Sequence, residues 1–281
     1  MKYPIAPSCA PQQIRFVRVL YKLNYKEEKI RDRMTKVVSF DLDGTLIDRK
    51  FMDSLWFEGF SRRYAERWGV SQEEALREIT RRYDGVGMER LEWYDIDYWW
   101  KEFELRGSWR DLVDEFRSNV RAYPEVHEVL DELHRRFKLI VITNGARELV
   151  EVETEQAGLN DYIDRMFSAT SDFGLVKKTS EFYLDILKAV GVSPAEVVHV
   201  GDNWVFDYLA PMEAGIRAFF LDRDGKQSGE SVVRDLKEFS RQLLTSEPEH
   251  MQDVAKRINE ARQRVKKDNV PHEKVKREFL E

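Results

Sequence analysis

The sequence predicts an α/β fold built on a doubly wound parallel sheet. The first observation is a set of short apolar runs, each suited to a strand that is buried on both faces. They span residues 36–41, 138–143, 197–202 and 216–222. The second observation is that helical patterns separate the runs along the chain. The third is that polar residues close the runs, at the edge where open parallel sheets bind their ligands.

Local sequence patterns predict the strands and helices of the core in chain order. The first run contains Val-Val-Ser-Phe, the second Leu-Ile-Val-Ile and the fourth Ala-Phe-Phe-Leu, all rich in residues that favour strands. Residues 126–137 and 180–190 have helical patterns and precede the second and third runs. Residues 232–244 are predicted to form a closing helix. This alternation predicts right-handed crossovers between parallel strands.

A long insertion separates the first two strands. Residues 49–123 contain six of the seven tryptophans and apolar residues at helix-like spacing, and Ser71 to Glu74 form a capping-box pattern. The segment is too long for a crossover and too apolar for a loop. We expect an all-helical cap domain at 49–123, inserted into a core domain formed by residues 34–48 and 124–245.

The two ends of the chain are interpreted as extensions. Residues 1–33 precede Met34, whose following residues resemble a natural protein start, and we assign them no function. Residues 246–281 follow as a charged helical segment with a narrow apolar stripe from Met251 to Val265. That stripe is interpreted as packing on the protein's own core, with a dimer contact as the alternative.

Composition excludes several classes of protein. The formal net charge is 46 − 52 = −6, so the chain as a whole has no electrostatic attraction to nucleic acid. Its single cysteine, Cys9, excludes an internal disulfide and a multi-cysteine zinc site. The sequence shows neither a long uncharged apolar segment nor a secretory signal pattern. We therefore expect a cytoplasmic protein that binds neither membrane nor nucleic acid, as a monomer or homodimer.

Two carboxylates follow the first strand. Asp41 and Asp43 are separated by one residue, and Gly44 permits a sharp exit from the strand. One carboxylate of such a pair can attack an electrophile while the other donates or accepts a proton. The pattern alone is weak, because glycosyltransferases and surface turns also contain Asp-x-Asp.

Further polar groups follow the other strands. Thr143 and Asn144 offer donors suited to phosphoryl oxygens, although Thr-Asn-Gly is also an ordinary turn. A lysine of the Lys177-Lys178 pair can offset the charge of carboxylates and of a bound phosphate. Asp202 and Asp207 provide hard oxygen ligands of the kind that Mg²⁺ prefers.

This ordered set resembles the haloacid dehalogenase-like (HAD) superfamily, over about residues 36–240, and the insertion resembles the helical C1 cap of subfamily I. The resemblance implies a Rossmann-like core. Asp41 is then the nucleophile that forms an aspartyl-phosphate, and Asp43 is the general acid and base. Thr143 and Asn144 bind the phosphoryl group together with the motif lysine. Spacing from Gly174 favours Lys177, while Lys178 stands where the family usually has proline and is the alternative.

The same resemblance implies a Mg²⁺ site. The ligands are the Asp41 carboxylate, the main-chain carbonyl of Asp43 and the carboxylate of Asp202. Asp207 acts through water or by orienting Lys177. Dehalogenase and phosphonatase branches carry a different residue at the position of Asp43, so the resemblance implies phosphoester hydrolysis.

The function expected from the sequence is a Mg²⁺-dependent phosphatase acting on a small phosphorylated metabolite. A phosphomutase of the same superfamily is the alternative, and a non-catalytic phosphate-binding scaffold protein is the alternative from another class. In the cap, Tyr83–Gly87 is a candidate mobile loop. Arg81 and Arg82 are expected to face solvent, with contact to a second anionic group on the substrate as the alternative. The aromatic residues of 93–100 are expected mainly to pack inside the cap, with stacking on a planar substrate as the alternative.

Overall fold

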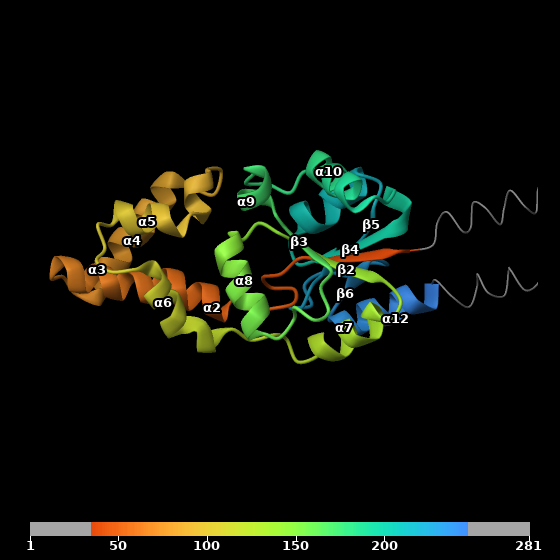
Figure 1. Ribbon diagram of the computed structural model, residues 1–281, viewed down its shortest axis with the longest axis horizontal. Coiled ribbons are helices and arrows are strands. Elements are labelled where there is room, and N and C mark those ends of the chain that lie inside the picture. The colour runs from red at the N-terminus through yellow and green to blue at the C-terminus, as the bar shows by residue number, and fades with distance from the viewer. Residues whose placement is uncertain (1–34, 247–281) are drawn as a thin grey trace, which may run out of the picture. The chain divides into compact units, whose positions relative to one another are not determined.

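The computed structural model of the protein describes residues 35–246 (Figure 1). Within them, Thr35–Arg241 form one compact unit. The extension at residues 1–33 and the stripe from Met251 to Val265 lie outside the described residues, so their interpretations stay predictions.

The core is a six-stranded parallel sheet with the strand order β3-β2-β1-β4-β5-β6. The chain moves outward from β1 in both directions, which is the doubly wound arrangement predicted from the sequence, with a topological switch point between β1 and β4. The strands are β1 (Val37–Phe40), β2 (Lys138–Thr143), β3 (Arg165–Ser168), β4 (Val197–Gly201), β5 (Arg217–Leu221) and β6 (Val232–Val233).

Two of these strands were absent from the sequence prediction. β3 has the sequence Arg-Met-Phe-Ser, which is too short and too polar at its start to form an apolar run. β6 has two residues, and Val232 pairs with Phe220 of β5. The predicted helix at 232–244 therefore begins only at Leu236, because its first residues extend the sheet instead.

Alternate residues of β1 contribute to opposite faces of the sheet, as the two-residue period of a strand requires. Val37 belongs to an apolar cluster with Phe182 and Ile186 of α10 (Ser180–Val190). Phe40 packs edge-on against Phe239 of α12 (Leu236–Ser246), with ring centroids 6.0 Å apart. The sheet is thus covered on both faces, which explains the uninterrupted apolar runs.

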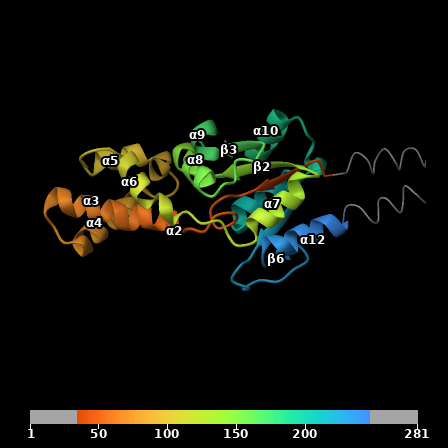
Figure 2. The same ribbon diagram turned by 60° about the horizontal axis from the view of Figure 1, so that its bottom comes forward.

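The remaining core helices connect the strands. They are α7 (Val126–His134), α8 (Arg147–Gln156), α9 (Ala169–Phe173), η4 (Pro194–Glu196), η5 (Trp204–Leu209) and α11 (Ala210–Glu213). α7 and α12 lie side by side in both ribbon views (Figure 2), and Ser240 donates a hydrogen bond of 2.8 Å to Glu132 between them.

The insertion after β1 is all helical in the described chain, as expected. It contains α2 (Lys50–Asp53), η1 (Ser54–Gly59), α3 (Phe60–Trp68), α4 (Gln72–Val86), η2 (Leu91–Tyr94), α5 (Ile96–Glu102), α6 (Trp109–Phe116) and η3 (Arg117–Asn119). The predicted capping box is confirmed, since Glu74 N–H donates to Ser71 Oγ and Ser71 N–H donates to the Glu74 carboxylate. The candidate loop at Tyr83–Gly87 is instead helical as far as Val86, and Gly87 ends the helix at φ 77°.

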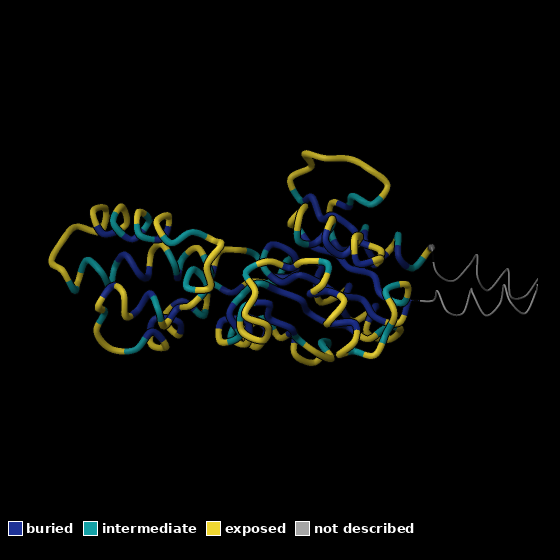
Figure 3. The backbone as a smooth tube through the Cα atoms, turned by 90° about the horizontal axis from the view of Figure 1, so that it is seen from above, coloured by how far each residue is buried: buried dark blue, intermediate teal, exposed yellow. Residues whose placement is uncertain are grey.

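The cap has its own aromatic core. Tyr83 is buried and packs against Trp99 and Phe103, with ring centroids 4.6 Å and 5.8 Å away. Phe60 packs against Phe103 from another helix. Dark blue segments in Figure 3 mark this buried interior and, separately, the buried sheet of the core.

The two chain segments that join cap and core run beside each other. Asp48 N–H donates to the Arg121 carbonyl and Tyr123 N–H donates to the Leu46 carbonyl, at 2.9 Å and 3.1 Å. The entry into the cap is therefore hydrogen-bonded to its exit a few residues after the Asp-x-Asp turn.

Among residues 35–246, no helix has the length and apolar character needed to cross a membrane.

Candidate active site

The carboxyl ends of β1, β2 and β4 meet at one edge of the sheet. Asp41 directly follows β1, Thr143 ends β2 and Asp202 directly follows β4. These residues line a cavity of about 440 Å³ together with Asp43, Asn144 and Asp207. The structure thus brings together every candidate site residue predicted from the sequence except Lys177.

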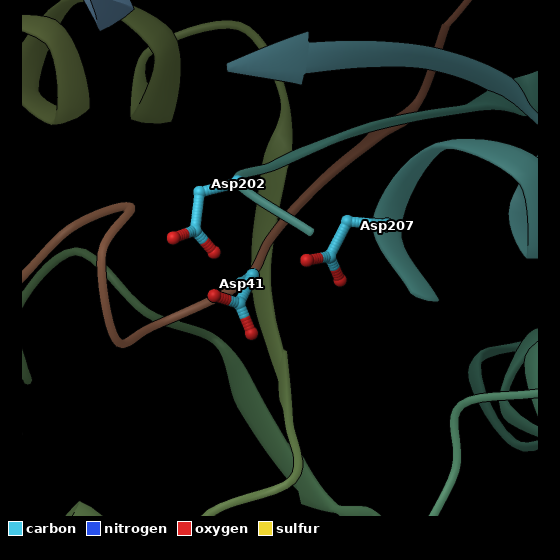
Figure 4. A group of neighbouring side chains, drawn as sticks. All are labelled: Asp41, Asp202 and Asp207. Atoms are coloured by element: carbon cyan, nitrogen blue, oxygen red, sulfur yellow. The ribbon is translucent and has the colours of Figure 1, made fainter. Parts of the chain in front are cut away.

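Three carboxylates form the centre of this edge. One oxygen from each of Asp41, Asp202 and Asp207 lies within 4.8 Å of the others. Figure 4 shows the side chains of Asp202 and Asp207 pointing toward Asp41 from neighbouring segments. Like charges this close repel one another, so the site needs compensating positive charge.

Lys178 supplies part of that charge from a buried position. Its Nζ atom lies 2.7 Å from Oδ1 of Asp41 and 2.5 Å from Oδ1 of Asp207, and its side chain is 3% exposed. Burial alone lowers a lysine pKa, but Asp207 and Asp41 more than offset that effect, so the pKa of Lys178 is raised. The ammonium also donates to the carbonyl of Ile142, which fixes it beneath the strand ends.

The sequence-based preference for Lys177 is corrected by this geometry. The side chain of Lys177 is 45% exposed and pairs with Glu89 of the cap segment. It does not line the cavity, whereas Lys178 does. Adjacent residues before a helix point in different directions, and only the second one here points toward the carboxylates. Asp207 therefore pairs with Lys178, and not with Lys177 as expected.

Asp207 is held from several sides. It accepts a hydrogen bond from the Asn203 N–H, at 3.0 Å, and contacts His199 Nε2 and Lys178 through its other oxygen. Burial raises the pKa of Asp207, but Lys178 and His199 outweigh burial and hold the pKa at about 2. Both oxygens are thus engaged, and the low pKa keeps Asp207 ionised at neutral pH as a partner of the lysine.

Both oxygens of Asp41 are also oriented. Oδ1 accepts from Lys178, and Oδ2 accepts from the Thr45 hydroxyl at 3.2 Å. Burial raises the pKa of Asp41, the attraction of Lys178 opposes this, and the charge of Asp207 raises it further. An additional cation beside Asp41 would favour its ionised form.

Asp43 lies close to Asp41 but, within the described part of the chain, forms no ion pair with Lys178, which pairs with Asp41. Burial, and then the charge of Asp41, raise the pKa of Asp43 to about 6. Its Oδ1 atom has no hydrogen-bond partner among the described residues. A carboxyl group that holds its proton near neutral pH is suited to general acid catalysis.

Glu153 of α8 is a buried neighbour of Asp43 that sequence reasoning missed. Its side chain is fully buried within hydrogen-bonding reach of Asp43, and burial followed by the charge of Asp43 raises its pKa well above the usual value. The sequence did contain a sign that Glu153 is buried, because it follows Leu149 by four residues and so lies on the same buried face of α8. A neutral Glu153 adds no charge to the site.

Thr143 and Asn144 present polar atoms after β2. The Thr143 hydroxyl accepts from the Gly145 N–H at 2.9 Å, and Asn144 Nδ2 donates to the Val176 carbonyl at 2.8 Å. The Asn144 Oδ1 atom is buried without a partner in the described residues. A Cβ at Gly145 would lie 2.9 Å from a methyl group of Val150 in α8, so any other residue at this turn would require that side chain to shift.

Asp202 is paired with Arg49, a second residue that sequence reasoning missed. Arg49 Nη2 lies 2.8 Å from Asp202 Oδ2. Burial and the charge of Asp41 raise the pKa of Asp202 to about 7, although Arg49 opposes the shift. Gly44 makes the close approach feasible, because a Cβ there would lie 2.2 Å from the same oxygen and its φ is 84°.

The charge balance and the donors at this edge fit a hard divalent cation. At the strand ends, four of the five carboxyl groups of the cavity lining, those of Asp41, Asp43, Asp202 and Asp207, face two cations, Arg49 and Lys178. The excess is 4 − 2 = 2 negative charges when all four are ionised. Asp41, Asp202 and Asp207 are the grouped carboxylates that could hold a metal ion, and Asp207 among them also contacts Lys178 and His199. Oxygen ligands of this kind suit Mg²⁺.

The predictions for arginine and tryptophan residues of the cap have different outcomes in the structure. Arg81 and Arg82 form ion pairs with Glu78 and do not line the cavity. Arg81 is exposed, as expected, while Arg82 is half-buried against the Phe103 ring. Trp99 and Trp100 are buried in the cap, as expected for packing, while Trp93 lines the cavity.

Comparisons with known proteins agree with the fold. A family model described as haloacid dehalogenase-like hydrolase matches residues 35–215. The GMP/IMP nucleotidase YrfG of Escherichia coli (strain K12) is 25% identical over 167 residues, which cover 59% of this chain and 73% of that protein. A phosphoglycolate phosphatase of Vibrio vulnificus (strain CMCP6) is 29% identical over 226 residues, covering 73% and 90%.

Solved structures show the same fold. The crystal structure of a HAD phosphatase from Thermococcus onnurineus aligns with a TM-score of 0.65 at 24% identity, covering 74% of this chain and 97% of that one. The match of the family model spans the Asp-x-Asp turn, the insertion and the segment that carries Asp202 and Asp207. The chain belongs to the haloacid dehalogenase-like hydrolase family.

Proposed function

We propose that this chain is a phosphatase that hydrolyses a small phosphomonoester through an aspartyl-phosphate on Asp41, with Asp43 as general acid and base. The observation that supports this most is the pairing of a buried Lys178 with Asp41, beside a second carboxyl group whose pKa is about 6. The phosphatases among the relatives support the same reaction class.

In the first step, an oxygen of Asp41 attacks phosphorus and the bond from phosphorus to the substrate alcohol breaks. Asp43 transfers its proton to the departing oxygen, because an alkoxide is a poor leaving group. Lys178 offsets negative charge on the transferred group, and the polar atoms of Thr143 and Asn144 line the cavity nearby.

In the second step, Asp43 is ionised and accepts a proton from an attacking water molecule. The bond between phosphorus and Asp41 breaks and inorganic phosphate is released. Asp41 returns as a carboxylate and Asp43 returns in its protonated form, so the two carboxyl groups complete a cycle without any other reactant.

We further propose that Mg²⁺ is the cofactor, held by the carboxylates of Asp41 and Asp202 and by the main-chain carbonyl of Asp43. When bound, the ion reduces the repulsion between an anionic phosphate and the carboxylates and stabilises charge in the transition state. The excess negative charge at the strand ends supports a divalent ion.

Asp43 is the feature that favours phosphoester chemistry over dehalogenation within the family. Displacing a halide ion requires no proton, so a dehalogenase has no use for a general acid at this position. The raised pKa of Asp43 fits an alcohol leaving group, which does require one.

The test is phosphate release from a panel of phosphomonoesters, with Mg²⁺ and with EDTA, by the wild type and by Asp41→Asn. We expect Mg²⁺-dependent release that the variant loses, and a phosphorylated wild-type Asp41 after rapid acid quenching. Asp185→Asn, at an exposed surface ion pair, is the matched control and should keep full activity. Normal release by Asp41→Asn contradicts the nucleophile, and isomerised product without free phosphate indicates a phosphomutase.

Cytoplasmic location, a small phosphorylated metabolite as the partner, and a monomeric or homodimeric state stay predictions from the sequence.

A further inference from the structure

The cavity that contains the strand-end carboxylates also has an aromatic wall. Trp56, Phe57, Trp93 and Tyr94 of the cap line it, and Phe206 of η5 lines it from the core. Met52 and Met88 add flexible thioether surface to the same cavity. Aromatic and thioether side chains of this kind contact planar, uncharged groups well.

One largely buried ring, that of Tyr83, contacts several members of the aromatic wall and itself lines the cavity. Tyr83 makes edge contacts with Trp56, Phe57 and Trp93, at centroid distances of 5.9, 6.3 and 5.9 Å. Its hydroxyl donates to the Trp56 carbonyl at 3.2 Å, and its ring packs on the cap interior at Trp99. The wall is therefore ordered before a ligand binds, which reduces the entropic cost of stacking on it.

The charges of the cavity argue against a second anionic group on the substrate. Arg49 and Lys178 are the cations of the described lining, and both are paired with carboxylates at the strand ends. Asp53 adds a further carboxyl group to the cap side of the lining. A substrate carboxylate placed against the aromatic wall would lose hydration without gaining a cation.

We infer that the substrate is a phosphomonoester whose alcohol carries an uncharged planar ring, as a nucleoside 5′-monophosphate does, and that Trp93 and its aromatic neighbours in the cap bind that ring. The inference rests on the proposed phosphatase function, since it places the phosphate at Asp41. A cavity of about 440 Å³ is within the usual range for a ligand of this size.

The experiment compares inosine 5′-monophosphate with ribose 5-phosphate and phosphoglycolate, using the full chain with Mg²⁺. The first two substrates share the phosphorylated ribose and differ by the base. Stacking of a base on aromatic side chains predicts a kcat/KM higher by about 5- to 140-fold for the nucleotide. Equal or better turnover of ribose 5-phosphate or phosphoglycolate would overturn the inference.

Two tryptophan variants test whether the preference for the nucleotide depends on Trp93. Trp93→Leu should remove most of the preference in kcat/KM for the nucleotide over ribose 5-phosphate, because leucine keeps apolar surface and loses the ring on which the base stacks. Trp68→Leu is the matched control, since Trp68 is exposed in the same cap and does not line the cavity. Equal loss of preference in both variants would count against a ring site at Trp93.

A binding measurement separates this inference from the proposed function. Asp41→Asn is titrated with inosine 5′-monophosphate and with ribose 5-phosphate, each followed by calorimetry. Tighter binding of the nucleotide supports the ring site even if no substrate releases phosphate, in which case only the proposed function fails. No difference between the two ligands overturns the ring site, while Mg²⁺-dependent release from any panel member still supports the phosphatase.

Discussion

Lys178 and Asp41 form a buried ion pair, with 2.7 Å between the lysine Nζ and the carboxylate Oδ1. The same ammonium contacts Asp207, whose pKa is held at about 2. One lysine thus connects the carboxylate that follows β1 with the carboxylate in η5. Because both carboxylates are buried, the lysine is required for stability as well as for charge compensation during the reaction.

Replacing Lys178 by Met should therefore affect both properties. We expect a loss of about 3–5 kcal/mol in the free energy of unfolding, because two buried carboxylates lose their cation. Phosphate release should fall by at least about 100-fold, the usual effect of removing a group that stabilises transition-state charge. Urea unfolding and phosphate assays measure the two effects. Lys177→Met is the matched control, and a larger loss in that variant would reverse the assignment of the lysine.

Replacing Asp43 by Asn should give an effect that depends on the leaving group. The amide cannot donate a proton to an alkoxide, so turnover of alkyl phosphates should fall by about 100- to 10,000-fold. p-Nitrophenyl phosphate has a good leaving group and should lose much less in its first step. Burst kinetics with both substrates provide the comparison, and equal losses in the first step would argue against Asp43 as the acid.

The stability of the metal-free protein should fall as pH rises from about 4 to 7. The folded pKa values of Asp43 and Asp202 are about 6 and about 7, above the usual value of 3.8. The folded state therefore holds these protons more tightly, which stabilises it below pH 4, and this contribution is lost as the pH rises through the folded values.

Mg²⁺ should counteract that loss, because the ion and protons compete for the same carboxylates. At 100 times its Kd, the ion stabilises the folded state by about 2.7 kcal/mol. Thermal unfolding in EDTA and in Mg²⁺, from pH 4 to 8, gives the comparison. A metal effect that is larger at pH 4 than at pH 7 would contradict binding at ionised Asp41 and Asp202.

Arg49 and Mg²⁺ should compete for Asp202. The guanidinium contacts Asp202 Oδ2, an oxygen of a proposed metal ligand, and the arginine side chain is 61% exposed. Arg49→Gln should therefore tighten Mg²⁺ binding by about two- to fivefold, the range expected for loss of an exposed ion pair. Calorimetric titration with Mg²⁺ measures the change, and Lys50→Gln serves as the control of equal charge. Weaker metal binding in Arg49→Gln would show that the arginine supports the site.

Much of the candidate site could be predicted because its residues follow strands. Asp41, Thr143 and Asp202 come directly at or after apolar runs, and parallel strands place their carboxyl ends at one edge. Local sequence therefore determined which chemical groups gather there. β3 and β6 escaped prediction because pairing with neighbouring strands, rather than their own composition, makes them strands.

The sequence by itself determined the doubly wound sheet, the helical insertion and the set of carboxylates at the strand ends, because these depend on residue periodicity along the chain. The tertiary structure alone decided that Lys178 faces the carboxylates and Lys177 faces Glu89. It also decided which tryptophans line the cavity. These choices depend on the directions of side chains and on contacts between residues distant in sequence, which residue periodicity does not encode.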